Sequence, residues 1–186
     1  MRAADLPCAK ARAAYHGRRR CRIARWVNWA LPIVTALAYG VLAGWFGLQV
    51  RAAAGGLMPF DMRVAGYGLD EARAFLRALT PDGRAIYLGP VRLNDTLFPI
   101  LFTLTLCLPL RGWAGPWFLP ALAYGLLDLA ENMAVAQLLQ SGPGVAAGPV
   151  AVASALTVTK FATLAIAVVL ALWGIWAKWR AGGRLR

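Results

Sequence analysis

The chain has 186 residues, of which 60% are hydrophobic and only 15% charged, and its mean hydropathy is +0.56. Soluble globular domains average about 45–50% apolar and about 25% charged residues, so this composition excludes that class and indicates a membrane protein of one domain. The net charge of +12 does not indicate a nucleic-acid partner, because the basic residues flank the apolar runs: eight lie in the first 25 positions and four follow Ala177.

Residues 1–25 form a basic tail that ends in Arg18-Arg19-Arg20-Cys21-Arg22. A secretion signal cleaved near Ala52-Ala53-Ala54 is one interpretation of this tail. The apolar run that follows is, however, much longer than the core of about 7–15 residues found in signal peptides. We therefore predict an uncleaved anchor, with a cytoplasmic tail that binds membrane lipids through their anionic headgroups.

The first predicted transmembrane helix spans about residues 26–48 and carries Gly40 and Gly44 one turn apart. Small residues at this spacing let a second helix approach closely. We predict that this face packs inside the bundle. The alternative is a homo-oligomer, or another membrane protein, bound through Gly40 and Gly44.

Residues 49–90 form the predicted outer loop. Ala72, Phe75, Leu76 and Leu79 recur at helical spacing after Asp70-Glu71, which predicts an amphipathic helix on the membrane surface or over the end of the bundle. A substrate lid is the alternative. Thr80-Pro81 then predicts the N-cap of a second helical stretch, kinked at Pro90, that continues into the next span.

Three further spans are predicted at about residues 91–110, 116–139 and 150–177. The expected fold is an all-α membrane protein, a four-transmembrane-helix bundle with an amphipathic helix in the outer loop between helices 1 and 2. Thirteen Lys and Arg residues on one side, against six within residues 49–93 on the other, favour cytoplasmic N- and C-termini in a bacterial inner membrane. Residues 180–186 would be the basic C-terminus.

The third span contains a polar cluster on one helix face, because residues three and four apart are neighbours on a helix. An ionisable group in hydrocarbon costs about 2.5–3.5 kcal/mol, so it normally faces a partner or a cavity. The candidate site residues are Asp128, Glu131, Asn132 and Tyr124 on the third span, Lys160 and Thr157 on the fourth, and Asp95 on the second.

Glu131 and Lys160 would lie roughly 12 Å and roughly 15 Å below the outer ends of their helices, at 1.5 Å per residue. This similar depth predicts that Lys160 pairs with Glu131 or Asp128. Because one lysine neutralises one carboxylate, the other acid would be free to bind a ligand, relay a proton or act in catalysis. Asp95 either joins the cluster or is a solvated acid in a first helical turn.

Several short strings, taken in order, resemble an uncharacterised family of small bacterial four-helix integral membrane proteins. The resemblance covers about residues 58–165 and implies the four-helix architecture, but it implies no activity. It singles out Asp95, Asp128, Glu131, Asn132 and Lys160. The strings are Phe60-Asp61-Met62-Arg63, Gly66-Tyr67, Asp70 to Leu79, Gly83-Arg84 with Tyr87, Asp95-Thr-Leu-Phe98-Pro99, Asp128-Leu-Ala-Glu131-Asn132 and Thr159-Lys160-Phe161.

The three cysteines and the single His16 are scattered, and no nucleophile motif or phosphate loop occurs, so we predict no catalytic residues, no metal and no cofactor. We favour a non-catalytic structural or interaction module. One alternative is a binder of, or an enzyme acting on, an amphipathic lipid-like ligand at Asp128, Glu131 and Lys160. The other is a proton or ion pathway. A cavity with an apolar wall that reaches the cluster would favour the ligand.

Overall fold

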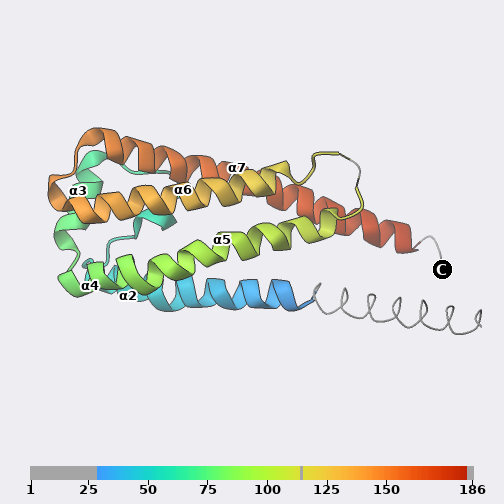
Figure 1. Ribbon diagram of the computed structural model, residues 1–186, viewed down its shortest axis with the longest axis horizontal. Helices are drawn as coiled ribbons and strands as arrows, with labels where there is room; N and C mark the ends of the chain where they lie inside the picture. Colours follow the sequence, from blue (N-terminus) through green and yellow to red (C-terminus); the bar gives the residue numbers. More distant parts are fainter. Residues whose placement is uncertain (1–28, 114, 184–186) are drawn as a thin grey trace, which may run out of the picture.

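The computed structural model describes residues 29–113 and 115–183, and these residues contain helices, turns and loops but no strand. The expectation of an all-α chain is therefore confirmed. Long helices lie side by side, and a short helix with its connecting loops closes one end of them (Figure 1). The basic tail and the end of the C-terminal segment lie outside the described residues.

The first helix is described from Trp29 to Ala53 and includes a π-helical stretch, η1 (Gly40–Phe46), and then α2 (Gly47–Ala53). It continues past residue 48, where the predicted span ended. Ala54 forms the C-cap of this helix, and Gly55 and Gly56 follow it at φ +63° and +89°. Glycine adopts such angles without steric cost, so the helix ends there.

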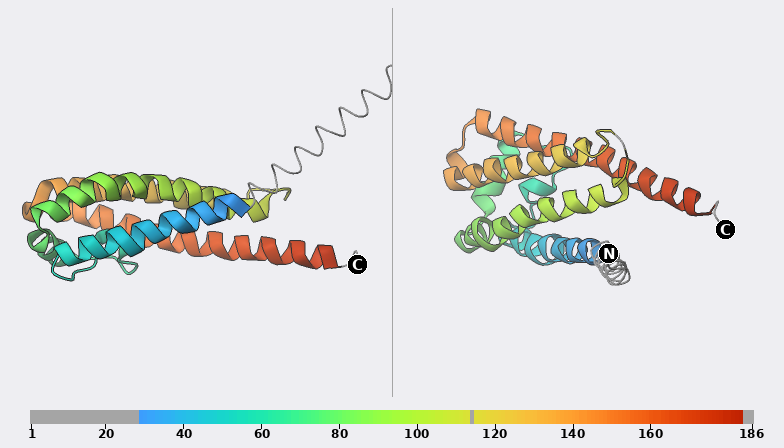
Figure 2. Two further views of the ribbon diagram at one scale, coloured as in Figure 1. Left: turned by 90° about the horizontal axis from the view of Figure 1, so that it is seen from below. Right: turned by 45° about the vertical axis from the view of Figure 1, so that its right-hand side comes forward.

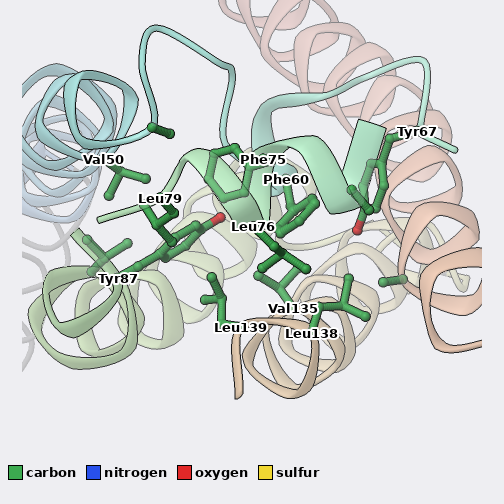
Figure 3. Packing of buried hydrophobic residues seen from close by; sticks show 14 of the residues in the cluster. Val50, Phe60, Tyr67, Phe75, Leu76, Leu79, Tyr87, Val135, Leu138 and Leu139 are labelled. Carbon is green, nitrogen blue, oxygen red and sulfur yellow. The ribbon is translucent and has the colours of Figure 1, made fainter. Parts of the chain in front are cut away.

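A cap, which we define as residues 54–80, folds over one end of the long helices. It contains the short turn η2 (Phe60–Met62) and the helix α3 (Leu69–Ala78). The apolar side of α3 is buried against the rest of the molecule, so this amphipathic helix covers the end of the bundle. Figure 3 shows the packing of this core, in which the Phe60 ring lies 4.7 Å from the Phe75 ring and 4.9 Å from the Tyr67 ring, centroid to centroid.

The second long helix runs from Pro81 to Leu110 without a break. It begins as predicted at Thr80, whose Oγ1 accepts a hydrogen bond of 3.1 Å from the Gly83 amide. Pro90 lies in a π-helical turn, which fits a residue that has no amide donor and crowds the preceding turn. The outer loop predicted to reach residue 90 therefore ends at Thr80. The parts of this helix are α4 (Pro81–Ile86), η3 (Tyr87–Val91), α5 (Arg92–Cys107) and η4 (Leu108–Leu110).

The last two long helices are α6 (Leu119–Ser141) and α7 (Ala147–Gly183), joined by the turn η5 (Gly142–Gly144). Gly142 ends α6 at φ +69°, a value that favours glycine. The corresponding spans were predicted at 116–139 and 150–177. With 37 residues, α7 is roughly 55 Å long at 1.5 Å per residue and extends beyond the end of α6 (Figure 1).

Three helices are long and apolar enough to cross a membrane: Trp29–Ala53, Pro81–Leu110 and Ala147–Ala181. α6 is not among them, although it has 23 residues. Its polar residues Asp128, Glu131 and Asn132 lower its hydropathy. The chain is therefore suited to membrane association through three helices, with α6 held among them.

The helices surround a space on one side of the molecule. α6 packs against α7 on one side and α5 on the other, and the first helix packs on α5, where Thr35 and Thr105 share a hydrogen bond of 2.8 Å. Figure 2 shows the first helix and α7 on the same side of α5 and α6. α5 and α6 thus form a floor, and the first helix and α7 form two walls.

Candidate functional site

The polar face of α6 is buried inside the protein. Asp128, Glu131 and Asn132 keep 2%, 0% and 7% of their surface exposed, whereas Leu126 and Met133, on the other side of the helix, are 70% and 62% exposed. The helical spacing of the three polar residues sets this division. α6 therefore turns its charged face toward the interior of the protein and its apolar face toward the surface.

A buried clasp, which we define as Asp128, Glu131, Thr157 and Lys160, joins α6 to α7. Lys160 Nζ lies 2.6 Å from Asp128 Oδ1 and also forms an ion pair with Glu131 Oε2. Thr157 Oγ1 donates to Glu131 Oε1. Tyr124 Oη donates a longer hydrogen bond, 3.2 Å, to the second Asp128 oxygen. One lysine thus serves two carboxylates, where the sequence predicted a pair with one of them.

Glu131 also faces the cap. Its Oε2 contacts the Lys160 ammonium as an ion pair but has no hydrogen bond of good geometry among the described residues, and the Tyr67 hydroxyl also lacks one. Thr157 and Glu131 nevertheless lie close enough to the Tyr67 hydroxyl group to influence its pKa. Burial, and then the Glu131 charge, raise the pKa of Tyr67 well above its ordinary value. Tyr67 therefore stays a neutral phenol at the edge of the clasp.

Gly66 fixes the position of Tyr67. The glycine has φ +81°, and a Cβ there would lie 2.7 Å from Ser154 Oγ on α7. The same Ser154 Oγ accepts a hydrogen bond of 2.9 Å from the Tyr67 amide. The close approach of the cap to α7, which only glycine permits, therefore brings the Tyr67 ring into the core beside the clasp.

Asp95 on α5 is buried, with 7% of its surface exposed, and is not a solvated first-turn acid. The helix begins well before it, at Pro81, so its carboxylate sits within the helical stretch. Asn132 Nδ2 donates a hydrogen bond of 2.5 Å to the backbone oxygen of Asp95, which ties α5 to α6. Among residues 29–113 and 115–183, no side chain forms a hydrogen bond or ion pair with the Asp95 carboxyl group.

The cap contributes one more carboxyl group, Asp61, which the sequence did not single out as a site residue. The buried Phe60 anchors the turn η2, and Asp61 follows it into the site. Tyr87 Oη donates a hydrogen bond of 2.5 Å to Asp61 Oδ1. The only sequence signal for Asp61, Tyr67 and Tyr87 was their presence in the strings that carry the family resemblance.

A cavity of about 670 Å³ lies between the two walls and reaches the polar residues. Asp61, Asp95, Asp128 and Lys160 line it near the cap. Farther from the cap its lining is mainly apolar. The lining residues are Pro32, Thr35, Ala36, Tyr39, Leu42 and Ala43 of the first helix; Met58, Asp61, Met62 and Val64 of the cap; Asp95, Phe98, Phe102 and Thr105 of α5; Tyr124 and Asp128 of α6; and Lys160, Phe161 and Leu164 of α7.

The cavity opens to the surface along the side of the molecule. Tyr39 and Val64 line it and are each 58% exposed, and Met58 is 43% exposed. These residues belong to the first helix and the cap, so the opening lies beside the first helix. A molecule could enter from the flank of the helices as well as past the cap.

The predicted packing of the first helix through Gly40 and Gly44 is not observed among the described residues. Nothing in the described structure lies within 4 Å of a Cβ placed at Gly40 or Gly44, so this face does not pack inside the bundle. Among residues 29–113 and 115–183, no three His, Cys, Asp or Glu side chains converge as a metal site would require.

Comparison of the chain with models of protein families, with curated proteins and with solved structures finds no match. No family model therefore supports the resemblance that was based on short strings in the sequence. The site geometry alone carries the functional conclusion.

Proposed function

We propose that this protein binds an amphipathic, lipid-like ligand within a membrane. The observation that carries the proposal is the cavity of about 670 Å³, which joins a polar end to an apolar wall. Ligand sites of drug-sized molecules have volumes of about 300–1,000 Å³ and are mostly apolar, with a few placed polar groups. The size and the lining of this cavity both fall within that description.

The distribution of polar groups fits an amphipathic molecule. Asp95, at the polar end, and Thr105, at the far end, are separated by ten residues of α5, or roughly 15 Å along the helix. Phe98 and Phe102 line the cavity between them. A headgroup at Asp95 would therefore leave its chain against aromatic and aliphatic side chains.

The proposal includes four spans in a bacterial inner membrane, with both termini in the cytoplasm. α6 has 23 residues, or roughly 35 Å, and packs between α5 and α7, so a bilayer around those two helices also surrounds α6. The excess of Lys and Arg outside the loop between the first two helices supports this orientation. Binding of anionic lipids by the tails, and a partner at Gly40 and Gly44, stay predictions.

The clasp supports the second candidate function, that of a structural module. Lys160 on α7 pairs with both Asp128 and Glu131 on α6, and Thr157 on α7 donates to Glu131, which suits the joining of the two helices. This role concerns only one side of the cavity. We therefore propose a structural task for the clasp and a binding task for the cavity beside it, with no chemical reaction.

Filling the cavity tests the binding proposal. Ala43 is a half-buried cavity residue, and Ala162 is an exposed α7 residue outside the cavity lining, so Ala43→Trp and Ala162→Trp form a matched pair. Each protein is reconstituted in nanodiscs of bacterial lipid, and native mass spectrometry records the species that it retains after release. Wild type and Ala162→Trp should retain the same bound species, and Ala43→Trp should lose it. Equal retention by all three, or no bound species in any of them, would contradict the proposal.

A further inference from the structure

We infer that the ligand of this cavity has a cationic amine headgroup, received by Asp95 and Asp61. The inference rests on the proposed binding function and specifies the chemistry of the ligand. Four carboxyl groups, those of Asp61, Asp95, Asp128 and Glu131, lie at or behind the polar end of the cavity, and among residues 29–113 and 115–183 only one Lys or Arg, Lys160, lines it. The polar end of the cavity therefore carries more acidic than basic side chains.

Lys160 is not free to receive an anionic headgroup. Its ammonium already contacts Asp128 at 2.6 Å and pairs with Glu131 as well. An anion at Lys160 would have to compete with two carboxylates held in place by α6. A phosphate or carboxylate headgroup is thus excluded on charge from the polar end of the cavity.

Asp95 is the residue that points to a ligand. It is 93% buried, lines the cavity and has no side-chain partner among the described residues. The Asp95 oxygens are also not fully enclosed: in the part of the chain that the structure describes, the buried side-chain atoms without a hydrogen bond are Tyr67 Oη and Glu131 Oε2. A buried carboxylate without a counterion is costly, and a cation bound beside it removes that cost.

Asp61 lines the same end of the cavity from the side of the cap. One of its oxygens accepts the hydrogen bond from Tyr87, which holds the carboxylate in position. The nearby Arg63 does not neutralise it, because its guanidinium donates to the Met58 carbonyl at 2.8 Å and lies over the Phe60 ring. Two carboxylates from separate elements are therefore available to one ammonium group.

The wall next to these acids suits a cation with an apolar chain. Aromatic faces attract cations, and Phe98, Tyr39 and Phe102 line the cavity beyond Asp95. Phe98 and Tyr39 lie together, with ring centroids 5.7 Å apart. An amine between Asp95 and Asp61 would have its first methylene groups against these rings.

Photolabelling with three probes of equal length tests the headgroup. The probes are dodecylamine, dodecanol and lauric acid, each with a diazirine in its chain, added to the full-length protein in nanodiscs. Labelled peptides are mapped by mass spectrometry, with excess unlabelled compound to show saturation. We expect saturable labelling of the α5 and α7 segments that line the cavity by the amine, and about tenfold weaker labelling by the other two probes.

Variants of the acids separate charge from folding. Asp95→Asn and Asp61→Asn should each weaken amine labelling about tenfold, whereas Asp95→Glu should retain the preference for the amine. Asp70→Asn changes an exposed acid of α3 and should behave as wild type. Saturable labelling that is equal for the three probes and unchanged in Asp95→Asn would overturn the inference and leave the proposed function standing. The absence of saturable labelling by every probe would overturn both.

Discussion

The acidic residues on the two sides of the cavity differ in the partners of their carboxyl groups. On the α6 and α7 side, Asp128 and Glu131 share Lys160, and Thr157 and Tyr124 supply further donors. On the α5 and cap side, Asp95 has no side-chain partner in the described structure. Asp61 accepts one hydrogen bond there, from the Tyr87 hydroxyl group. Asp95 and Asp128 are both buried, at 7% and 2% exposure. The partner, rather than burial, distinguishes an acid that joins helices from an acid available to a ligand.

Removing the lysine tests the paired side and should have the largest effect. Lys160→Ala leaves two buried carboxylates without their counterion, which should lower the free energy of unfolding by about 3–5 kcal/mol. Unfolding of the purified protein in mixed micelles measures the change. Lys178→Ala is the control, because Lys178 is exposed near the end of the same helix. A loss as small for Lys160→Ala as for Lys178→Ala would show that the clasp does not hold α6 and α7 together.

Removing a hydroxyl group from the clasp should have an intermediate effect. Thr157→Val keeps the side-chain shape but takes away the donor to Glu131 Oε1, which should lower the free energy of unfolding by about 1–3 kcal/mol. Thr159→Val is the matched control, since Thr159 is exposed and its hydroxyl group donates to the Ala155 carbonyl of its own helix. The same unfolding assay compares the two valine variants. Equal losses would mean that Glu131 does not depend on Thr157.

On the opposite side of the cavity, the loss of a hydrogen bond should have a smaller effect. Tyr87→Phe removes the hydroxyl group that donates to Asp61, and we expect a loss of about 1 kcal/mol in the free energy of unfolding. Asp61 is partly exposed, so water can replace the missing donor. Binding of dodecylamine should weaken in the same variant, because Asp61 loses the contact that positions it. A Tyr87→Phe protein as unstable as Lys160→Ala would remove the distinction between the two sides.

The paired side could be predicted from the sequence. Asp128, Glu131 and Asn132 share a helix face by spacing alone, and counting residues from the helix ends places Lys160 at a similar depth. Both arguments depend only on regular helix geometry. They do not reveal that Lys160 contacts both acids, because that depends on how closely α6 and α7 approach.

The unpaired side could not be predicted in the same way. Asp61 reaches the site through a short turn anchored by Phe60, and a loop has no period from which the direction of a side chain can be read. Asp95 was a candidate first-turn acid because the second span was predicted to begin near residue 91, whereas the helix begins at Pro81 and a π-helical turn carries it past Pro90. The cavity depends on the first helix packing on α5 apart from α7, and this follows from tertiary packing.

The central claim is that Asp95 binds the headgroup of a ligand, whereas Lys160 stabilises the fold by joining α6 to α7. The most direct measurement is the thermal stability of wild type and Asp95→Asn in nanodiscs, each with and without dodecylamine, with dodecanol as the control for effects on the lipid. Without the amine, we predict that Asp95→Asn is at least as stable as wild type, because the substitution removes a buried carboxylate that has no counterion. With the amine at a hundred times the dissociation constant of wild type, wild type should gain about 2.7 kcal/mol, and Asp95→Asn, which binds about tenfold more weakly, should gain only about 1.4 kcal/mol. An Asp95→Asn protein that loses stability as Lys160→Ala does, or that gains as much from the amine as wild type, would contradict the claim.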